Sequence, residues 1–333
     1  MKHKILVALD GSDESLVTAW LLKKQGHSIR AVLFDVSEKS ELKEQLVQHV
    51  HDFERKLGVP VQLMDCGKEV RDIVSKEISF EQARGNRYDL KAIFDQKFLF
   101  PKLFAMKAHF QFDKIATGHR VNLQFEPLEN LMKVVRYQPK NEDESALILG
   151  LSQQQLQSLE FPLGSIPMSM IQKLASELQL GGGITPVKFE LPNDSDESVE
   201  NIDATEAAEN NVADDLSLMV ETFNPSVIFG GPVEATAITP AVLKNREIKE
   251  VWLENAVWFS GHDLGLKVKN CLMSWSFEHQ PIAVKVMQYE GGGLKALFDH
   301  PITGEDANLF NGDQVLWLEG DTVLGGARVV KCL

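Results

Sequence analysis

Short apolar runs alternate with amphipathic stretches along the first 117 residues, and this pattern most constrains the fold. Such alternation is typical of a parallel sheet covered by helices. The predicted strands are Lys4–Leu9, Ile29–Phe34, Val59–Met64 and Lys114–Thr117. The predicted helices are Leu16–Gln25, Glu41–Leu57 and Leu99–His109, with two shorter ones after Ser152. Glycines at 26 and 58 follow the first two helices, where a C-terminal cap favours them.

After about Phe223 the helical spacing gives way to strand-like segments separated by Gly, Pro or Asp turns. These segments are Val251–Phe259, Leu266–Trp275, Ile282–Tyr289, Leu294–Phe298, Gln314–Leu318 and Thr322–Val330. Short strands at this spacing predict a small antiparallel barrel or sandwich. We therefore expect an α/β domain over 1–187, an acidic linker or loop over 188–222, and a reduced central region plus β-barrel over 223–333.

The acidic residues are concentrated in one segment. The formal net charge is −14, and residues 190–215 contain ten Asp or Glu side chains and no Lys or Arg. The low hydrophobicity of this segment indicates a solvated linker; an acidic decoy for a basic partner, or a cover over a basic groove, is the alternative. The overall charge argues against tight binding of nucleic acid, because proteins that grip a polyanion usually present a basic surface.

Neither a membrane span nor a metal site is indicated by the sequence. The apolar run Ile5–Leu9 is too short for a signal peptide or a bilayer span. Cys66, Cys271 and Cys332 are far apart and form no CxxC pair, which predicts neither disulfides nor a cluster of metal-binding thiolates. The histidines show no HxH or HExxH spacing. We expect a cytoplasmic protein with no membrane partner, no metal ligands and no Fe–S cluster.

The turn after the first predicted strand is the first candidate site. Residues 10–15 read DGSDES, and the backbone N–H groups of a Gly/Ser turn at a helix N-terminus can bind phosphate. Asp10, Asp13 and Glu14 would repel a polyphosphate unless a divalent metal ion bridged the charges. Alternatively, these carboxylates only cap the helix and complement its dipole.

Two resemblances begin at this turn. KILVALDGSDES resembles the start of a universal stress protein, but that likeness ends after one helix. A longer resemblance is to the bacterial tRNA-specific 2-thiouridylases, which are PP-loop ATP pyrophosphatases. VALDGSDES stands where that family has a strand and SGGVDSS, and KIATGH at 114–119 is similar to the family's YIATGH. Two later segments are also similar to the family's sequence: NEDESALILGLSQQQLQSLEFPLG, and the closing segment from FDHPITGEDANLF to LGGARVV.

The resemblance implies a PP-loop parallel-sheet domain followed by a C-terminal antiparallel β-barrel, with ATP and Mg²⁺ as ligands and tRNA as partner. The nucleotide-binding candidates that it implies are Ala8, Asp10, Gly11, Ser12, Ser15, Phe34, Gly118 and His119. Of the most informative PP-loop positions only Gly11 and Ser15 are kept. Phe34 would flank the adenine, and His119 has either a ligand-facing or a packing role.

The departures from the family concern sulfur transfer. Counting from Gly85, and back from the IATGH loop, places Phe94 at the position of the family's first catalytic cysteine. LGGGITPVKFELP stands where the second cysteine is expected, and Cys66 is interpreted as a buried inert thiol. A phenyl ring cannot carry persulfide sulfur. No residue is therefore assigned a catalytic role.

Losses on the RNA side accompany the missing cysteines. The family's YTIGQRKGLG text has no counterpart, and its basic RYR is replaced by Ser274-Trp275-Ser276, which predicts weakened tRNA binding. The leading hypothesis is a thiouridylase-like pseudoenzyme that retains at most nucleotide or tRNA binding. The alternatives are an ATP-dependent adenylating enzyme with an external nucleophile, and an interaction or regulatory protein with a protein partner.

Overall fold

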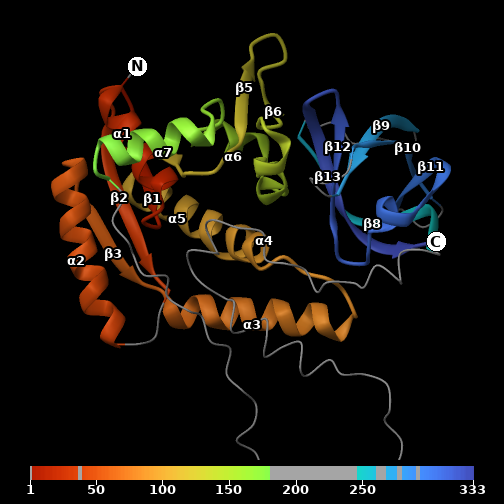
Figure 1. Ribbon diagram of the computed structural model, residues 1–333, viewed down its shortest axis with the longest axis horizontal. Helices are drawn as coiled ribbons and strands as arrows, with labels where there is room; N and C mark the ends of the chain where they lie inside the picture. The colour runs from red at the N-terminus through yellow and green to blue at the C-terminus, as the bar shows by residue number, and fades with distance from the viewer. Residues whose placement is uncertain (1, 37–39, 181–245, 260–267, 276–279, 290–292) are drawn as a thin grey trace, which may run out of the picture.

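The computed structural model describes residues 2–36, 40–180, 246–259, 268–275, 280–289 and 293–333. Its first domain contains a five-stranded parallel sheet in the order β3-β2-β1-β4-β7 (Figure 1). The strands are β1 (Lys4–Leu9), β2 (Ser28–Asp35), β3 (Val61–Asp65), β4 (Lys114–Ala116) and β7 (Leu159–Glu160). Because β1 lies between β2 and β4, the carboxyl ends of these three strands lie together at one edge of the sheet.

Alternate residues of β1 enter two separate cores, as the period of two in a strand requires. Ile5, Val7 and Leu9 pack in the core shared with α1 (Asp13–Lys24), α2 (Ser40–Leu57) and α7 (Met168–Glu177). Leu6 and Ala8 face the opposite core, formed with α3 (Gly67–Ala83), α4 (Leu90–Phe94), the π-helical turn η1 (Asp95–Leu99) and α5 (Phe100–Phe110). Helices therefore cover both faces of the sheet.

The second domain is a closed antiparallel barrel of six strands. The strand order is β12-β9-β10-β11-β8-β13, and an additional pairing of β12 with β13 closes it. The strands are β8 (Glu247–Trp258), β9 (Lys269–Ser274), β10 (Ile282–Gln288), β11 (Leu294–Thr303), β12 (Gln314–Glu319) and β13 (Thr322–Cys332), with the turn η4 (Gly304–Ala307). The fully buried Trp317 stacks on Trp258 with ring centroids 4.2 Å apart. This arrangement confirms the predicted barrel.

A hairpin of the first domain extends the sheet of the barrel. β5 (Asn122–Glu126) pairs with β6 (Leu131–Val135), and β6 pairs with β13 (Figure 1). The turns η2 (Lys140–Glu142) and η3 (Ser145–Ile148) and the helix α6 (Gln153–Gln157) follow the hairpin. A second contact joins Arg328 of β13 to Glu81 of α3 by two hydrogen bonds.

The predicted α/β sheet with a C-terminal barrel is confirmed, although α3, α4 and the β5–β6 hairpin were not predicted. The predicted linker at 188–222 and the acidic segment 190–215 lie outside the described residues, so the boundaries 1–187 and 223–333 stay predictions. Among the described residues, no helix is long and apolar enough to cross a membrane.

Candidate functional site

A pocket lies at the carboxyl ends of β1, β2 and β4, the edge where open α/β sheets bind ligands. The hollow is open on one side, and it holds about 420 Å³ of space when the adjoining solvent is included. It is lined by Ala8, Leu9, Asp10, Ser12, Glu14, Ser15, Phe34, Lys91, Leu99, Thr117, Gly118, His119 and Glu144. Seven of the eight residues that the resemblance proposed for a nucleotide line this pocket, and the eighth, Gly11, lies in the same turn.

The turn between β1 and α1 satisfies its own hydrogen bonds. Oδ1 of Asp10 accepts from the Ser12 amide at 2.8 Å and from the Ser12 hydroxyl at 2.6 Å. Ser12 Oγ in turn accepts from the Ser15 amide at 3.2 Å and caps the helix. Ser15 Oγ accepts from the Asp10 amide at 3.3 Å and donates to the Ser12 carbonyl at 3.1 Å. The Gly11 φ of +83° lets the chain reverse into this turn.

Glu14 adds a second carboxylate to the N-terminal end of the helix. Its Oε1 accepts from Nη1 of Arg120 at 3.0 Å, and burial raises the pKa of this carboxyl despite its own backbone amide and the Arg120 charge. Side chains of the turn therefore occupy the amides of Ser12 and Ser15, and the carboxylates complement the helix dipole. This geometry agrees with the alternative in which the acidic residues of the turn cap the helix and complement its dipole.

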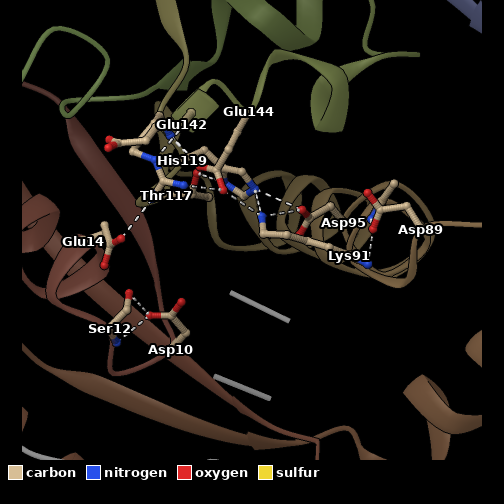
Figure 2. A network of polar contacts seen from close by, with 12 residues as sticks. Asp10, Ser12, Glu14, Asp89, Lys91, Asp95, Thr117, His119, Glu142 and Glu144 are labelled. Atoms are coloured by element: carbon tan, nitrogen blue, oxygen red, sulfur yellow. Dashed lines mark hydrogen bonds and ion pairs between the residues drawn. The ribbon is translucent and has the colours of Figure 1, made fainter. Parts of the chain in front are cut away.

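A chain of buried ion pairs continues from the turn to α4 (Figure 2). Arg120 joins Glu14 to Glu144, with Nη2 3.3 Å from Glu144 Oε1. Lys91 Nζ lies 3.2 Å from Glu144 Oε1 and 3.2 Å from Asp95 Oδ2. The Arg120 amide also donates to Glu144 Oε2 at 2.8 Å. Arg120 and Lys91, the two basic side chains of this row of ion pairs, are therefore both paired with carboxylates of the protein.

The network sets the charge state of its members. Burial alone would raise the pKa of Glu144, but electrostatic interactions, the largest of them with Lys91, outweigh it and hold that pKa at about 2. Burial would lower the pKa of Lys91, but Asp95 and Glu144 outweigh it and the pKa is raised. Glu144 and Lys91 are therefore both ionised at neutral pH, as a buried pair must be to be stable.

His119 is held by polar and aromatic contacts. Its Nδ1 lies 2.8 Å from the Thr117 hydroxyl and its Nε2 lies 3.1 Å from Asp95 Oδ2. The ring packs against Phe100 and Phe161, with centroids 5.4 and 6.0 Å away. Oδ1 of Asp95 is buried without a hydrogen-bond partner among the described residues. His119 thus borders the pocket and has a packing role as well.

Phe94 does not reach the pocket surface. Its side chain is fully buried in the core formed with α3 and α5, and its ring lies 5.2 Å from that of Phe98. No cysteine lines the pocket. Cys66 is buried at the start of α3, while Cys271 and Cys332 lie on β9 and β13, and burial raises the pKa of each thiol to about 11. All three are therefore protonated at neutral pH.

The described residues contain no group of three or more His, Cys, Asp or Glu side chains arranged to hold a metal ion. Lys91, Glu144, Leu99 and Thr117 are pocket residues that the sequence did not point to. The i,i+4 spacing of Lys91 and Asp95 was a visible signal for one ion pair. No local signal existed for the contact of Glu144 with Lys91, because it depends on the tertiary fold.

A family profile described as "tRNA methyl transferase HUP domain" matches residues 3–185, more than half of the chain. The chain belongs to this family. Curated proteins that are similar to this chain carry the name tRNA-specific 2-thiouridylase, and three of them are described below. This name is the one that the resemblance in the sequence implies.

The relative from Leptothrix cholodnii is 28% identical over 54% of this chain and 48% of its own length. The relative from Endomicrobium trichonymphae is 21% identical over 98% of this chain and 99% of its own. The relative from Natranaerobius thermophilus is 29% identical over 57% of this chain and 55% of its own. The match therefore spans about half the length of the first and third of these HUP-domain relatives.

Among solved structures, the U34-tRNA thiolase NcsA from Methanococcus maripaludis with its 4Fe–4S cluster is 18% identical to this chain. The match covers 56% of this chain and 60% of the NcsA chain, with a TM-score of 0.37. A TM-score of this size is too low to carry an argument about function for this HUP-domain protein.

Proposed function

We propose that this protein is a tRNA 2-thiouridylase-like pseudoenzyme that has lost sulfur transfer. The carrying observation is that Phe94, which the count along the sequence places at the family's nucleophile position, has no exposed surface. Thiolation needs a thiolate beside the activated uridine, and a buried phenyl ring supplies neither the sulfur nor the access. The absence of cysteine from the pocket lining supports the same proposal.

Weak tRNA binding is part of this proposal. Several basic residues of the first domain are paired with carboxylates: the pairs are Lys97–Glu77, Lys102–Glu69, Lys133–Glu126 and Arg136–Asp143. A cation that already has a carboxylate partner contributes less to phosphate binding, because that pair must be broken or shared. Ser274 and Trp275 replace two residues of the family's RYR, and Ser276 lies outside the described residues.

The test is a thiolation assay with the full chain, tRNA, ATP, Mg²⁺ and a persulfide donor. We expect no 2-thiouridine at position 34 by nucleoside mass spectrometry, while an active 2-thiouridylase in a parallel reaction forms it. Formation of 2-thiouridine by the purified protein, at a rate that scales with its concentration, would overturn the proposal. A gel-shift titration with total tRNA measures the residual RNA binding.

Adenylation with an external nucleophile is the second candidate activity, and it requires ATP with Mg²⁺ at residues 11–15. The carboxylates of Asp10 and Glu14 at this turn count against it unless a metal ion bridges them to the triphosphate.

A role as an interaction protein depends on the acidic segment 190–215. Pull-down with the full chain and with that segment deleted tests this role, since an unchanged set of partners excludes it.

A further inference from the structure

We infer that the pocket takes an uncharged nucleoside and discriminates against a nucleoside triphosphate. The inference deepens the proposed function and rests on it only for the location of a nucleotide-derived site. The position of the pocket at the carboxyl ends of the strands is that of a ligand site. The two halves of the pocket differ in chemistry, and this difference carries the argument.

One half of the pocket is apolar and suits a planar ring. The side chains of Ala8, Phe34 and Leu99 line it, and the Phe34 ring makes an edge contact with the Phe98 ring, with centroids 5.4 Å apart. Packing of a flat heterocycle against such a surface removes apolar area from water without a charge requirement. A nucleobase therefore fits this half of the pocket.

The other half does not fit a triphosphate. An anion at a helix N-terminus needs free backbone N–H groups. Here the Ser12 amide donates to Asp10 and the Ser15 amide donates to Ser12 Oγ, so the protein's own oxygens occupy the places of phosphate oxygens. A methyl group on Gly118 would lie 2.9 Å from the Ser15 amide nitrogen, which shows that the 114–119 loop already lies against this turn.

The charge of the pocket reinforces the steric argument. Three carboxylates, Asp10, Glu14 and Glu144, line it together with Lys91. The Lys91 ammonium is held between Glu144 and Asp95, and the Arg120 guanidinium behind them is held between Glu14 and Glu144. A phosphate would have to break buried ion pairs to recruit either cation, and removing one partner of such a pair is costly. The nearby carboxylates would also repel it.

The same carboxylates suit the hydroxyl groups of a ribose. Ser12 engages Oδ1 of Asp10, a residue that lines the pocket, and among the described residues no hydrogen bond is made to Asp10 Oδ2. A ribose hydroxyl donates to a carboxylate, and hydrogen bonds to a charged acceptor are stronger than those between neutral groups. A neutral nucleoside thus satisfies both halves of the pocket.

The experiment is calorimetric titration of the full chain with adenosine, AMP and ATP, each with and without Mg²⁺. We expect adenosine to bind at least about tenfold more tightly than ATP under both conditions, because each phosphate adds repulsion. ATP or Mg²⁺–ATP binding as tightly as adenosine, or no adenosine binding in calorimetry and ligand-detected NMR, would overturn the inference. These outcomes are independent of the thiolation assay, which tests the proposed function.

A variant that restores the family residues at the turn tests the cause. Asp10→Ser with Ser12→Gly removes both internal acceptors, and we expect its affinity for ATP to rise at least about tenfold relative to adenosine. Asp299→Ser is the charge-matched control for Asp10→Ser on the exposed face of β11, where Asp299 pairs with Lys285 at 2.8 Å. An unchanged ratio in the double variant, or an equal change in the control, contradicts the assignment.

Discussion

At the residue scale, Phe94 is a packing residue of the core below the sheet, and it is the residue on which the proposed loss of sulfur transfer depends. Its ring fills the core between α3 and α5 and contacts Phe98, so the local structure now depends on the size of the side chain. A cysteine at this site would leave much of that volume empty. Phe94→Cys would therefore introduce a thiol at the cost of a cavity.

The first prediction is that Phe94→Ala lowers the free energy of unfolding by about 3–5 kcal/mol, as other large core truncations do. Phe80→Ala is the control, because Phe80 is 53% exposed on the same α3–α4 side of the sheet. We expect the control to lose less than about 1 kcal/mol in urea unfolding monitored by circular dichroism. Equal losses in the two variants would show that Phe94 is not a packing residue.

The second prediction concerns Lys91. Lys91→Met leaves Asp95 and Glu144 as buried carboxylates without their shared cation, and we expect a loss of about 3–5 kcal/mol at pH 7. Lys173→Met is the control, since Lys173 and its partner Glu177 are both more than half exposed. Urea unfolding at pH 7 measures both variants. An equal effect of the two substitutions would contradict a stabilising role for the buried chain.

The pH dependence of the Lys91 effect has a definite sign. The folded pKa of Glu144, about 2, lies below its unfolded value of 4.5. Between these values the unfolded chain binds more protons, so this carboxyl stabilises the fold above pH 4.5 and the contribution is lost as pH falls toward 2. Without Lys91 the folded pKa of Glu144 rises, so the stability gap between variant and wild type should narrow on acidification. A gap that stays constant between pH 7 and pH 3 would contradict the pairing.

At the element scale, the sequence predicts the elements whose hydrophobic pattern is strong. β1 is an apolar run after Lys4, β2 contains the apolar run at residues 31–34, and α2 carries its apolar residues at regular helical spacing. α3 was missed because its buried stripe consists of only a few residues, Val70, Val74 and Ile78 among them, in a charged segment. The β5–β6 hairpin was missed because its strands have half-exposed faces and gain stability from pairing with the distant β13.

The same reasoning separates the predictable and unpredictable parts of the site. The turn residues Asp10 to Ser15 were predictable, because a strand, a Gly/Ser turn and a helix are local in sequence. The ion pairs of Arg120 with Glu14 and of Lys91 with Glu144 were not, since each joins elements that are distant along the chain. Their partners follow from the sheet order, which no local pattern specifies.

The third prediction concerns the loop before β12. Gly312 has a φ of +93°, and a Cβ at this position would lie 2.1 Å from the Arg87 carbonyl oxygen. We expect Gly312→Ala to destabilise the protein by more than about 2 kcal/mol, because backbone strain adds to the displaced contact. Gly304→Ala is the matched control, with a φ of +61° and no atom within 4 Å. Gly304→Ala should cost only about 1–2 kcal/mol. Thermal unfolding measures the stability of both variants. Identical losses would exclude the contact with Arg87.

At the scale of the whole molecule, polar contacts fix the barrel on the first domain. Arg328 of β13 donates twice to Glu81 of α3, and Arg87 donates to Asp313 at 3.4 Å. The guanidinium groups of Arg87 and Arg246 both lie over the Phe310 ring, at 4.9 and 3.9 Å from its centroid. These contacts lie away from the pocket, so loosening them should leave nucleoside binding unchanged.

The fourth prediction is that Glu81→Gln weakens this interface by about 2–4 kcal/mol at pH 7, because the partly buried Arg328 loses its charged partner. Burial opposes ionisation of Glu81, but hydrogen bonds from Arg328 and Asn86 outweigh it and lower the pKa below 4.5. The contribution is therefore present above pH 4.5 and lost as pH falls below it, so wild type and variant should converge in acid.

Hydrogen exchange of the Arg87 amide reports on this interface directly, since that amide donates to the Asn311 carbonyl at 2.8 Å across the domain contact. Glu126→Gln is the control, because Glu126 also has a lowered pKa but pairs with Lys133 on the β5–β6 hairpin. We expect faster exchange in Glu81→Gln alone at pH 7. Because backbone exchange itself slows in acid, each variant is compared with wild type at the same pH. Protection equal to wild type at pH 7 would mean that the hairpin pairing alone holds the barrel in place.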